Sequence, residues 1–154
     1  MERVNIYTYS TAKSPKAMKS QCEAVCFVIE YQDRPDKAIS QMKIIKEMSW
    51  YQSELYVLER ALSRINAMYE VHVYTECSYV AAGFEQGWIE QWKENDWITS
   101  SNEEVKNKAE WQALLEQVQQ CDLVFHVKEE HSYRKWLKAN MEKEKERCRK
   151  QKKT

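Results

Sequence analysis

The chain has 154 residues and a formal net charge of zero, and 43% of its residues are hydrophobic and 12% aromatic. This length and hydrophobic content are typical of one folded domain with a buried core and exclude a disordered chain. The neutral charge argues against a strongly basic nucleic-acid binder, and the presence of only 2 glycines excludes a glycine-rich phosphate-binding loop.

The sequence contains no apolar run of about 18 residues, which a membrane-spanning helix requires. The first residues, Met1 to Val4, lack the apolar core of a signal peptide. We therefore expect a soluble, cytoplasmic protein without a membrane partner. The cysteines form no Cys-x-x-Cys pair, so we expect all of them to be reduced thiols, mostly buried. They are Cys22, Cys26, Cys77, Cys121 and Cys148.

The first third of the chain predicts three strands. Residues 4–9 alternate apolar and polar side chains, 22–31 form a longer apolar run, and 38–48 carry apolar residues suited to a partner strand. The segment Asp33–Asp36 predicts a short turn between the second and third strands. A short turn favours antiparallel pairing, so the three strands are expected to form a meander.

Helical spacing begins at Leu55 and continues to Ile65, with Ser49 or Ser53 as the candidate N-cap. A strand over 71–75 follows, and the remaining segments predict short helices, a helix, a strand and a final helix. Those segments are 78–84, 88–92, 111–118, 123–127 and 132 to the end. This order predicts one mixed α/β domain over 1–142, with helices packed against the sheet.

Residues 143–154 are expected to form a basic C-terminal extension, since the stretch from Lys143 to Lys153 has seven Lys or Arg against two Glu. Such a segment is typical of a solvated or frayed helix end. The alternative is an arm that binds nucleic acid.

Glu76 lies where the strand over 71–75 ends and the next helix begins. In an α/β protein the carboxyl end of a strand opens into a crevice where ligands bind, so Glu76 is a candidate catalytic or ligand-binding residue. The alternative is a solvated acid that caps the following helix.

Several segments together resemble the type-I ribonuclease H family over nearly the whole chain. Residues 4–10 resemble its first strand, which ends in Thr-Asp-Gly-Ser, and 54–62 resemble the helix that opens with its catalytic glutamate. Residues 74–80 are similar to its Tyr-Thr-Asp-Ser-x-Tyr-Val motif. The tryptophans Trp88, Trp92 and Trp97, followed by residues 105–111, resemble its tryptophan-rich handle and Val-Lys-Asn-x-x-x-Trp motif.

The resemblance implies an RNase H-like fold: a mixed five-stranded sheet, with three antiparallel strands and then two parallel ones, flanked by helices. Family members cut the RNA strand of an RNA–DNA hybrid with two divalent metal ions held by four acids. A histidine after the last strand assists, and a basic handle grips the hybrid.

The family positions place Glu54 and Glu76 as catalytic residues and metal ligands, but other positions depart from the pattern. Tyr9 stands at the first aspartate, and a phenol is neutral at pH 7 and a poor ligand for Mg²⁺. An ungapped count after the last strand puts Glu130 at the histidine and Asn140 at the last acid, where its amide could be a neutral metal ligand. If His131 is instead the family histidine, the last acid is not defined.

The two negative charges of Glu54 and Glu76 would only partly offset the four positive charges of two divalent ions, which is costly in a buried site. The resemblance therefore implies Mg²⁺ or Mn²⁺ as cofactor, with one ion favoured over two. Glu130, on the loop after the last strand, is the candidate for a third acid.

The expected nucleic-acid surface is also altered. Between Glu85 and Trp97 there are four acids and only one base, Lys93, and this handle should repel phosphates. The handle tryptophans are expected to pack against the domain. The candidate nucleic-acid contacts are Lys13, Lys16, Gln52, Ser78, Trp88, Trp92, Lys93, Lys106 and Asn107.

Three hypotheses follow. The leading one is an RNase H-like domain with impaired or lost two-metal catalysis that binds an RNA–DNA hybrid, another nucleic acid or a protein. The alternative is an active, divergent ribonuclease H, with Glu54, Glu76 and Glu130 holding metal and His131 relaying protons. A third is a protein-interaction module built on an exposed Trp88 or Trp92.

Overall fold

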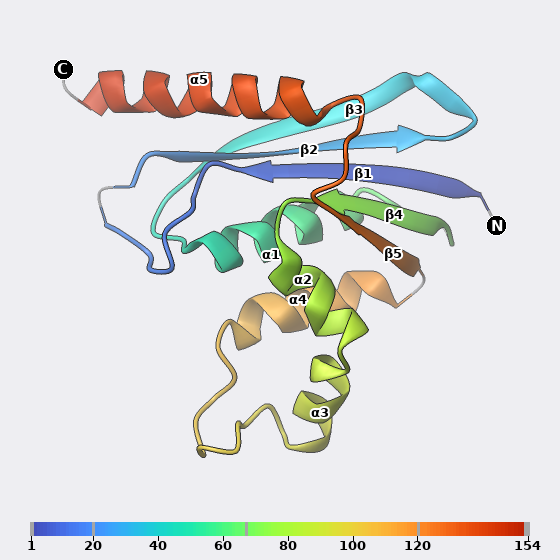
Figure 1. Cartoon of the computed structure of the whole chain (residues 1–154), viewed down its shortest axis with the longest axis vertical. Helices are drawn as coiled ribbons and strands as arrows, with labels where there is room; N and C mark the ends of the chain where they lie inside the picture. The colour runs from blue at the N-terminus through green and yellow to red at the C-terminus, as the bar shows by residue number, and fades with distance from the viewer. Residues whose placement is uncertain (1, 20, 67, 120, 153–154) are drawn as a thin grey trace.

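The computed structural model describes residues 2–19, 21–66, 68–119 and 121–152 (Figure 1). It contains five strands: β1 (Arg3–Ser10), β2 (Glu23–Tyr31), β3 (Arg34–Ile45), β4 (Glu70–Thr75) and β5 (Asp122–Val127). The helices are α1 (Trp50–Leu62), α2 (Ser78–Glu85), α3 (Trp88–Glu94), α4 (Lys108–Val118) and α5 (Arg134–Lys152). Within the described residues, no helix is both long and apolar enough to cross a membrane.

The strands form one sheet in the order β3-β2-β1-β4-β5. β1 pairs antiparallel with β2, β2 pairs antiparallel with β3, and β1–β4 and β4–β5 pair in parallel. The predicted mixed sheet is confirmed. β3 begins at Arg34, inside the stretch where a turn was predicted, because the chain reverses over Gln32 and Asp33.

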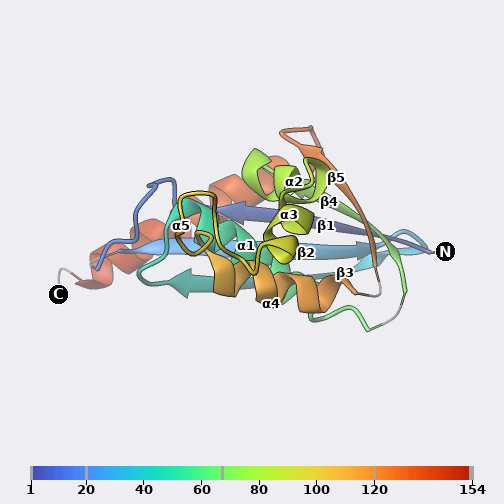
Figure 2. The ribbon, with the colours of Figure 1, turned by 90° about the horizontal axis from the view of Figure 1, so that it is seen from below.

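Helices cover both faces of the sheet, with α5 on one side and α1, α2 and α4 on the other (Figures 1 and 2). The alternation of side chains along β1 separates the two layers: Ile6 enters the larger core cluster, whereas Tyr7 and Tyr9 enter the smaller one. The smaller cluster contains Leu137 and Met141, the apolar residues through which α5 packs on the sheet.

The N-terminus of α1 is fixed by a capping box. The Ser49 hydroxyl accepts from the Gln52 amide, and the Gln52 side chain accepts from the Ser49 amide. Ser53, the other candidate cap, hydrogen-bonds to Ser10 and the Trp50 carbonyl instead. The helix ends at Leu62, so Ile65 lies beyond it.

Two cysteines correct the expectation of five free thiols. Cys22 and Cys148 form a disulfide, with Cα atoms 5.8 Å apart across a sequence separation of 126 residues. Cys26, Cys77 and Cys121 are free, as expected. Because α5 folds back across the sheet, it places Cys148 beside the loop that precedes β2. The spacing of the cysteines along the sequence does not predict that these two residues are close in space.

Candidate active site

The candidate site lies at one edge of the sheet. β1 and β4 are parallel neighbours, so their carboxyl ends, which carry Tyr9 and Thr75, meet at the same edge. Glu76 follows β4 directly, and Glu54 lies near the N-terminus of α1. The N-cap of α2 is Cys77 and no side chain caps that helix, so Glu76 does not act as a helix cap.

Tyr9 lies at the centre of this site. Its phenol donates a hydrogen bond to Glu142 over 3.4 Å. Burial, together with the carboxylates of Glu142, Glu54 and Glu76, raises the pKa of Tyr9 to about 12. Tyr9, which was predicted to stand at the first family aspartate, is therefore a neutral phenol near pH 7 with three carboxylates nearby.

Glu54 is 2% exposed, and its Oε2 accepts a hydrogen bond of 2.9 Å from Trp50 Nε1. Its Oε1 has no hydrogen-bond partner in the part of the chain that the structure describes. Burial raises the pKa of Glu54 to about 7, against the opposing effects of Lys13 and the Trp50 hydrogen bond. This carboxyl therefore titrates near neutral pH, and one of its oxygens is free to accept a proton or bind a cation.

Glu76 is paired with a cation of the chain itself. Arg134 Nη2 lies 2.8 Å from Glu76 Oε1, and Arg134 Nη1 lies 2.5 Å from Glu130 Oε1. Glu130 is otherwise largely exposed. The guanidinium of Arg134 thus forms ion pairs with both Glu76 and Glu130, two of the acids predicted to bind metal.

The ring of His131 packs against the ring of Tyr7, with 4.6 Å between centroids. Burial lowers the pKa of His131, whereas Glu76 opposes this shift. The negative charge of Glu76 therefore acts on the imidazole of His131.

Asn140 does not join the group around Tyr9 in the described contacts. Its side-chain amide donates to the Trp136 carbonyl one turn earlier in α5. Sequence reasoning missed Glu142, which reaches Tyr9 instead. The spacing of Leu137 and Met141, an i, i+4 pair, predicts the sheet-facing side of this helix but does not distinguish Asn140 from Glu142, which both adjoin Met141.

Among the residues proposed to contact nucleic acid, Lys13 lies closest to the acids. Its Nζ sits 4.7 Å from the Tyr9 ring centroid and 5.5 Å from that of Trp50. Gln52 bonds to Glu110 in addition to closing the capping box, so its side-chain donors and acceptors are engaged. Lys16, Ser78, Lys93 and Lys106 are exposed.

The handle residues mostly pack on the domain. Trp92 contacts the buried Trp111 edge-on, with 5.3 Å between centroids, and Trp88 lies 6.1 Å from Trp92. Asn107 donates to the Tyr79 hydroxyl. Trp88 and Trp92 are both half-buried, neither open to solvent nor fully enclosed. The protein-interaction hypothesis therefore stays a prediction.

The donor set fits a divalent cation only in part. Glu54 offers a buried carboxylate oxygen without a partner, which suits a hard ion. In contrast, no three His, Cys, Asp or Glu side chains within the described ranges form a group that could hold a metal ion. Among the described residues, the free oxygen of Glu54 is therefore the ligand that the site offers most directly to a divalent cation.

The fold defines the class of this protein. The chain is similar in structure to LC9-RNase H1, a type 1 RNase H with the type 2 active-site motif, with a TM-score of 0.71 and 14% identity over 93% of this chain and 72% of that one. It is also similar to the N-terminal RNase H domain of a Mycobacterium tuberculosis protein, with a TM-score of 0.66 and 10% identity over 98% and 99% of the two chains. These likenesses establish an RNase H-like fold.

Sequence comparison then gives the family. The family model for RNase H matches residues 1–145, and the chain belongs to that family. It is 44% identical over 61 residues to the ribonuclease H of Acetivibrio thermocellus, covering 40% of this chain and 42% of that one. It is 37% identical over 79 residues to the ribonuclease H of Caldicellulosiruptor saccharolyticus, covering 51% and 54%. The matches span about half the length of these relatives.

Proposed function

We propose that this RNase H domain binds nucleic acid, with RNA–DNA hybrid as the leading candidate, while its two-metal cleavage is impaired. The observation that carries the proposal is the position of Tyr9. A neutral phenol stands at the end of β1, among the carboxylates of Glu54, Glu76 and Glu142. A bridging ligand for two cations must be an anion, and the high pKa of Tyr9 keeps it protonated near neutral pH.

The charge around the remaining acids supports the same proposal. Arg134 pairs with Glu76, and Lys13 lowers the pKa of Glu54. Each of the two acids that match the family pattern therefore has a cation of the chain nearby. A metal ion would compete with these cations, since both neutralise the same carboxylates.

The relatives favour the alternative, an active ribonuclease H, more directly than this proposal, because the matched proteins carry that name. One contact in this chain also favours it. Glu142 lies at the Tyr9 hydroxyl, and with Glu54 and Glu76 it brings the acids around Tyr9 to three. In this alternative a rearrangement of Arg134 would free Glu76 for a metal ion.

A cleavage assay separates the two functions. A hybrid with a labelled RNA strand is incubated with Mg²⁺ or Mn²⁺, and wild type is compared with Glu76→Gln, Glu142→Gln and the control Glu144→Gln, whose residue pairs with Arg147 in the same helix. The proposal expects binding of the hybrid without metal-dependent cleavage. Cleavage that Glu76→Gln abolishes and Glu144→Gln retains would establish the alternative.

The distribution of charge indicates which part of the chain would contact a nucleic acid. The acidic handle argues against tight phosphate contact there, whereas α5 carries basic residues to its end. Binding to hybrid, duplex and single strand at increasing salt measures this contribution. Truncation after Glu142 is expected to reduce the salt dependence, and an unchanged slope would exclude residues 143–154 from binding.

A further inference from the structure

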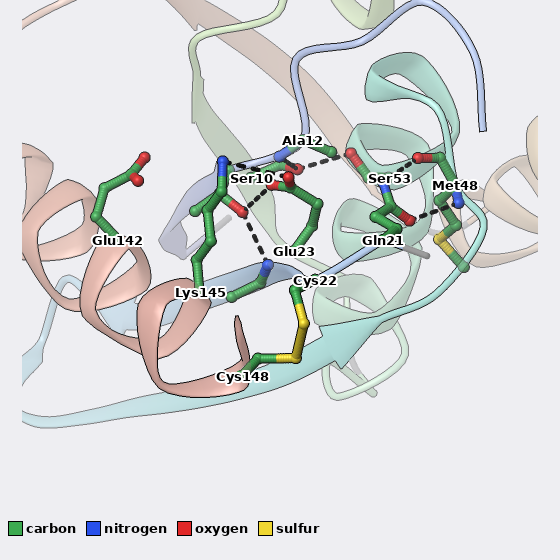
Figure 3. A network of polar contacts seen from close by, with 12 residues as sticks. Ser10, Ala12, Gln21, Cys22, Glu23, Met48, Ser53, Glu142, Lys145 and Cys148 are labelled. Atoms are coloured by element: carbon green, nitrogen blue, oxygen red, sulfur yellow. Dashed lines mark hydrogen bonds and ion pairs between the residues drawn. A yellow bond between two sulfur atoms is a disulfide. The ribbon is translucent and has the colours of Figure 1, made fainter. Parts of the chain in front are cut away.

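Three consecutive residues at the start of β2 connect this strand to α5, to the end of β1 and to the segment before α1 (Figure 3). Gln21 exchanges two hydrogen bonds with the Met48 backbone, just before the N-cap of α1. Cys22 forms the disulfide with Cys148 of α5. Glu23 pairs with Lys145 of α5 at 3.2 Å and accepts a hydrogen bond from Thr11, which follows β1.

This connection extends to the site itself. Thr11 follows Ser10, whose hydroxyl lies 2.7 Å from that of Ser53, the neighbour of Glu54 in sequence. A continuous series of contacts therefore joins the disulfide, the end of β1 and the start of α1.

The C-terminal half of α5 depends on this attachment. Within the described part of α5, the buried apolar residues are Leu137 and Met141, and none follows Met141. Beyond that point, the contacts to the sheet side include the Tyr9–Glu142 hydrogen bond, the Glu23–Lys145 ion pair and the disulfide. A helix end without buried apolar residues opens readily when its remaining attachments are removed.

The exposure of the two bonded cysteines determines which of their sulfur atoms an external thiol can attack. Cys22 is 6% exposed and Cys148 is half-buried, so Cys148 is the sulfur that an external thiol reaches more easily. The free thiols are less suited to exchange, because burial raises the pKa of Cys26 to about 11 and that of Cys77 to about 12. Cys121 is half-buried, and nothing described places a second cysteine beside it.

We propose that Cys22 and Cys148 form a reversible thiol–disulfide exchange site for a small thiol of the glutathione class, and that the bond holds the C-terminal half of α5 on the sheet. In reduction, an external thiolate attacks Cys148 Sγ and Cys22 leaves as a thiolate that takes a proton. A second external thiolate attacks the external sulfur of the mixed disulfide, and Cys148 leaves and is protonated. Two small thiols thus become one small disulfide, and re-oxidation by that disulfide reverses both steps.

The test uses the full chain equilibrated with reduced or oxidised glutathione, then alkylated and analysed by mass spectrometry and hydrogen exchange. The expected results are a Cys22–Cys148 linked peptide only in oxidised protein, and amide exchange over 143–152 that is at least about 10-fold faster after reduction. Cys121→Ser should behave as wild type, whereas Cys148→Ser should exchange rapidly in both conditions. Absence of the linked peptide, or equal exchange in the two redox states, would overturn the proposal, which does not depend on whether the site cleaves RNA.

Discussion

The guanidinium of Arg134 lies 2.8 Å from the carboxylate of Glu76, across 58 positions of sequence. The contact forms where α5 begins and β4 has just ended. Both side chains are partly exposed, at 29% and 25%, so the pair is exchangeable with solvent ions rather than locked in the core. A cation from outside the chain must displace Arg134 before it can use this oxygen of Glu76.

Removal of Arg134 should therefore strengthen cation binding. Arg134→Ala is expected to bind Mn²⁺ about 10-fold more tightly than wild type, as measured by calorimetry. Lys135→Ala removes a neighbouring exposed charge that makes no ion pair with Glu76 among the described residues, and it should leave the affinity unchanged. Equal affinities in wild type and Arg134→Ala would show that the ion pair does not compete with metal.

Glu54 should make the stability of the protein depend on pH near neutrality. Because its folded pKa of about 7 lies above the ordinary 4.5, the folded state holds an extra proton between these values. The free energy of unfolding should fall as pH rises through this window, and the loss should be complete above about pH 7. Glu54→Gln should abolish the fall and be more stable than wild type at alkaline pH by on the order of 3 kcal/mol.

Denaturant unfolding over a pH series measures this effect. Glu59→Gln is the matched control in the same helix, because Arg60 lowers the pKa of Glu59 and its titration lies below the window. The assignment fails if wild type and Glu54→Gln show the same slope across neutral pH.

Gly83 should not tolerate a side chain, although it lies in a helix where alanine is normally favoured. A Cβ at this position would overlap the ring of Trp111, which is fully buried. Gly83→Ala is expected to destabilise the fold by about 1–3 kcal/mol and to lower the melting temperature. Gly87→Asn serves as control, because Gly87 has φ +76° with nothing within 4 Å of an added Cβ, and Asn tolerates that backbone region. A stabilised Gly83→Ala would contradict the packing described here.

The capping box of α1 should stabilise the helix that carries Glu54. Ser49→Ala removes the acceptor for the Gln52 amide and is expected to cost about 1 kcal/mol by thermal or denaturant unfolding. Ser63→Ala, which removes an exposed hydroxyl at the other end of α1, should cost less. Equal losses in the two variants would argue against a specific role for the cap.

The sequence predicted the sheet and the positions of Glu54 and Glu76 because alternation, helical spacing and motif order are local signals. It did not predict the Arg134–Glu76 pair or the Cys22–Cys148 disulfide, since both depend on how α5 folds back across the sheet. The same reason explains why the Tyr9–Glu142 hydrogen bond was not predicted. An ungapped count from Lys128 does not show how the loop before α5 orients the helix, and it therefore gave no indication that Glu142 reaches Tyr9.

The proposed loss of two-metal catalysis depends on Tyr9, because a neutral phenol replaces the carboxylate that would bridge two divalent cations. The most direct measurement is cleavage of the RNA strand of an RNA–DNA hybrid in Mn²⁺ by wild type and Tyr9→Asp, with Tyr7→Phe as control for a change in a neighbouring phenol. The account predicts hybrid binding without cleavage for wild type and Tyr7→Phe, and metal-dependent cleavage once Asp replaces Tyr9. Efficient cleavage by wild type that is lost in Glu76→Gln would contradict it.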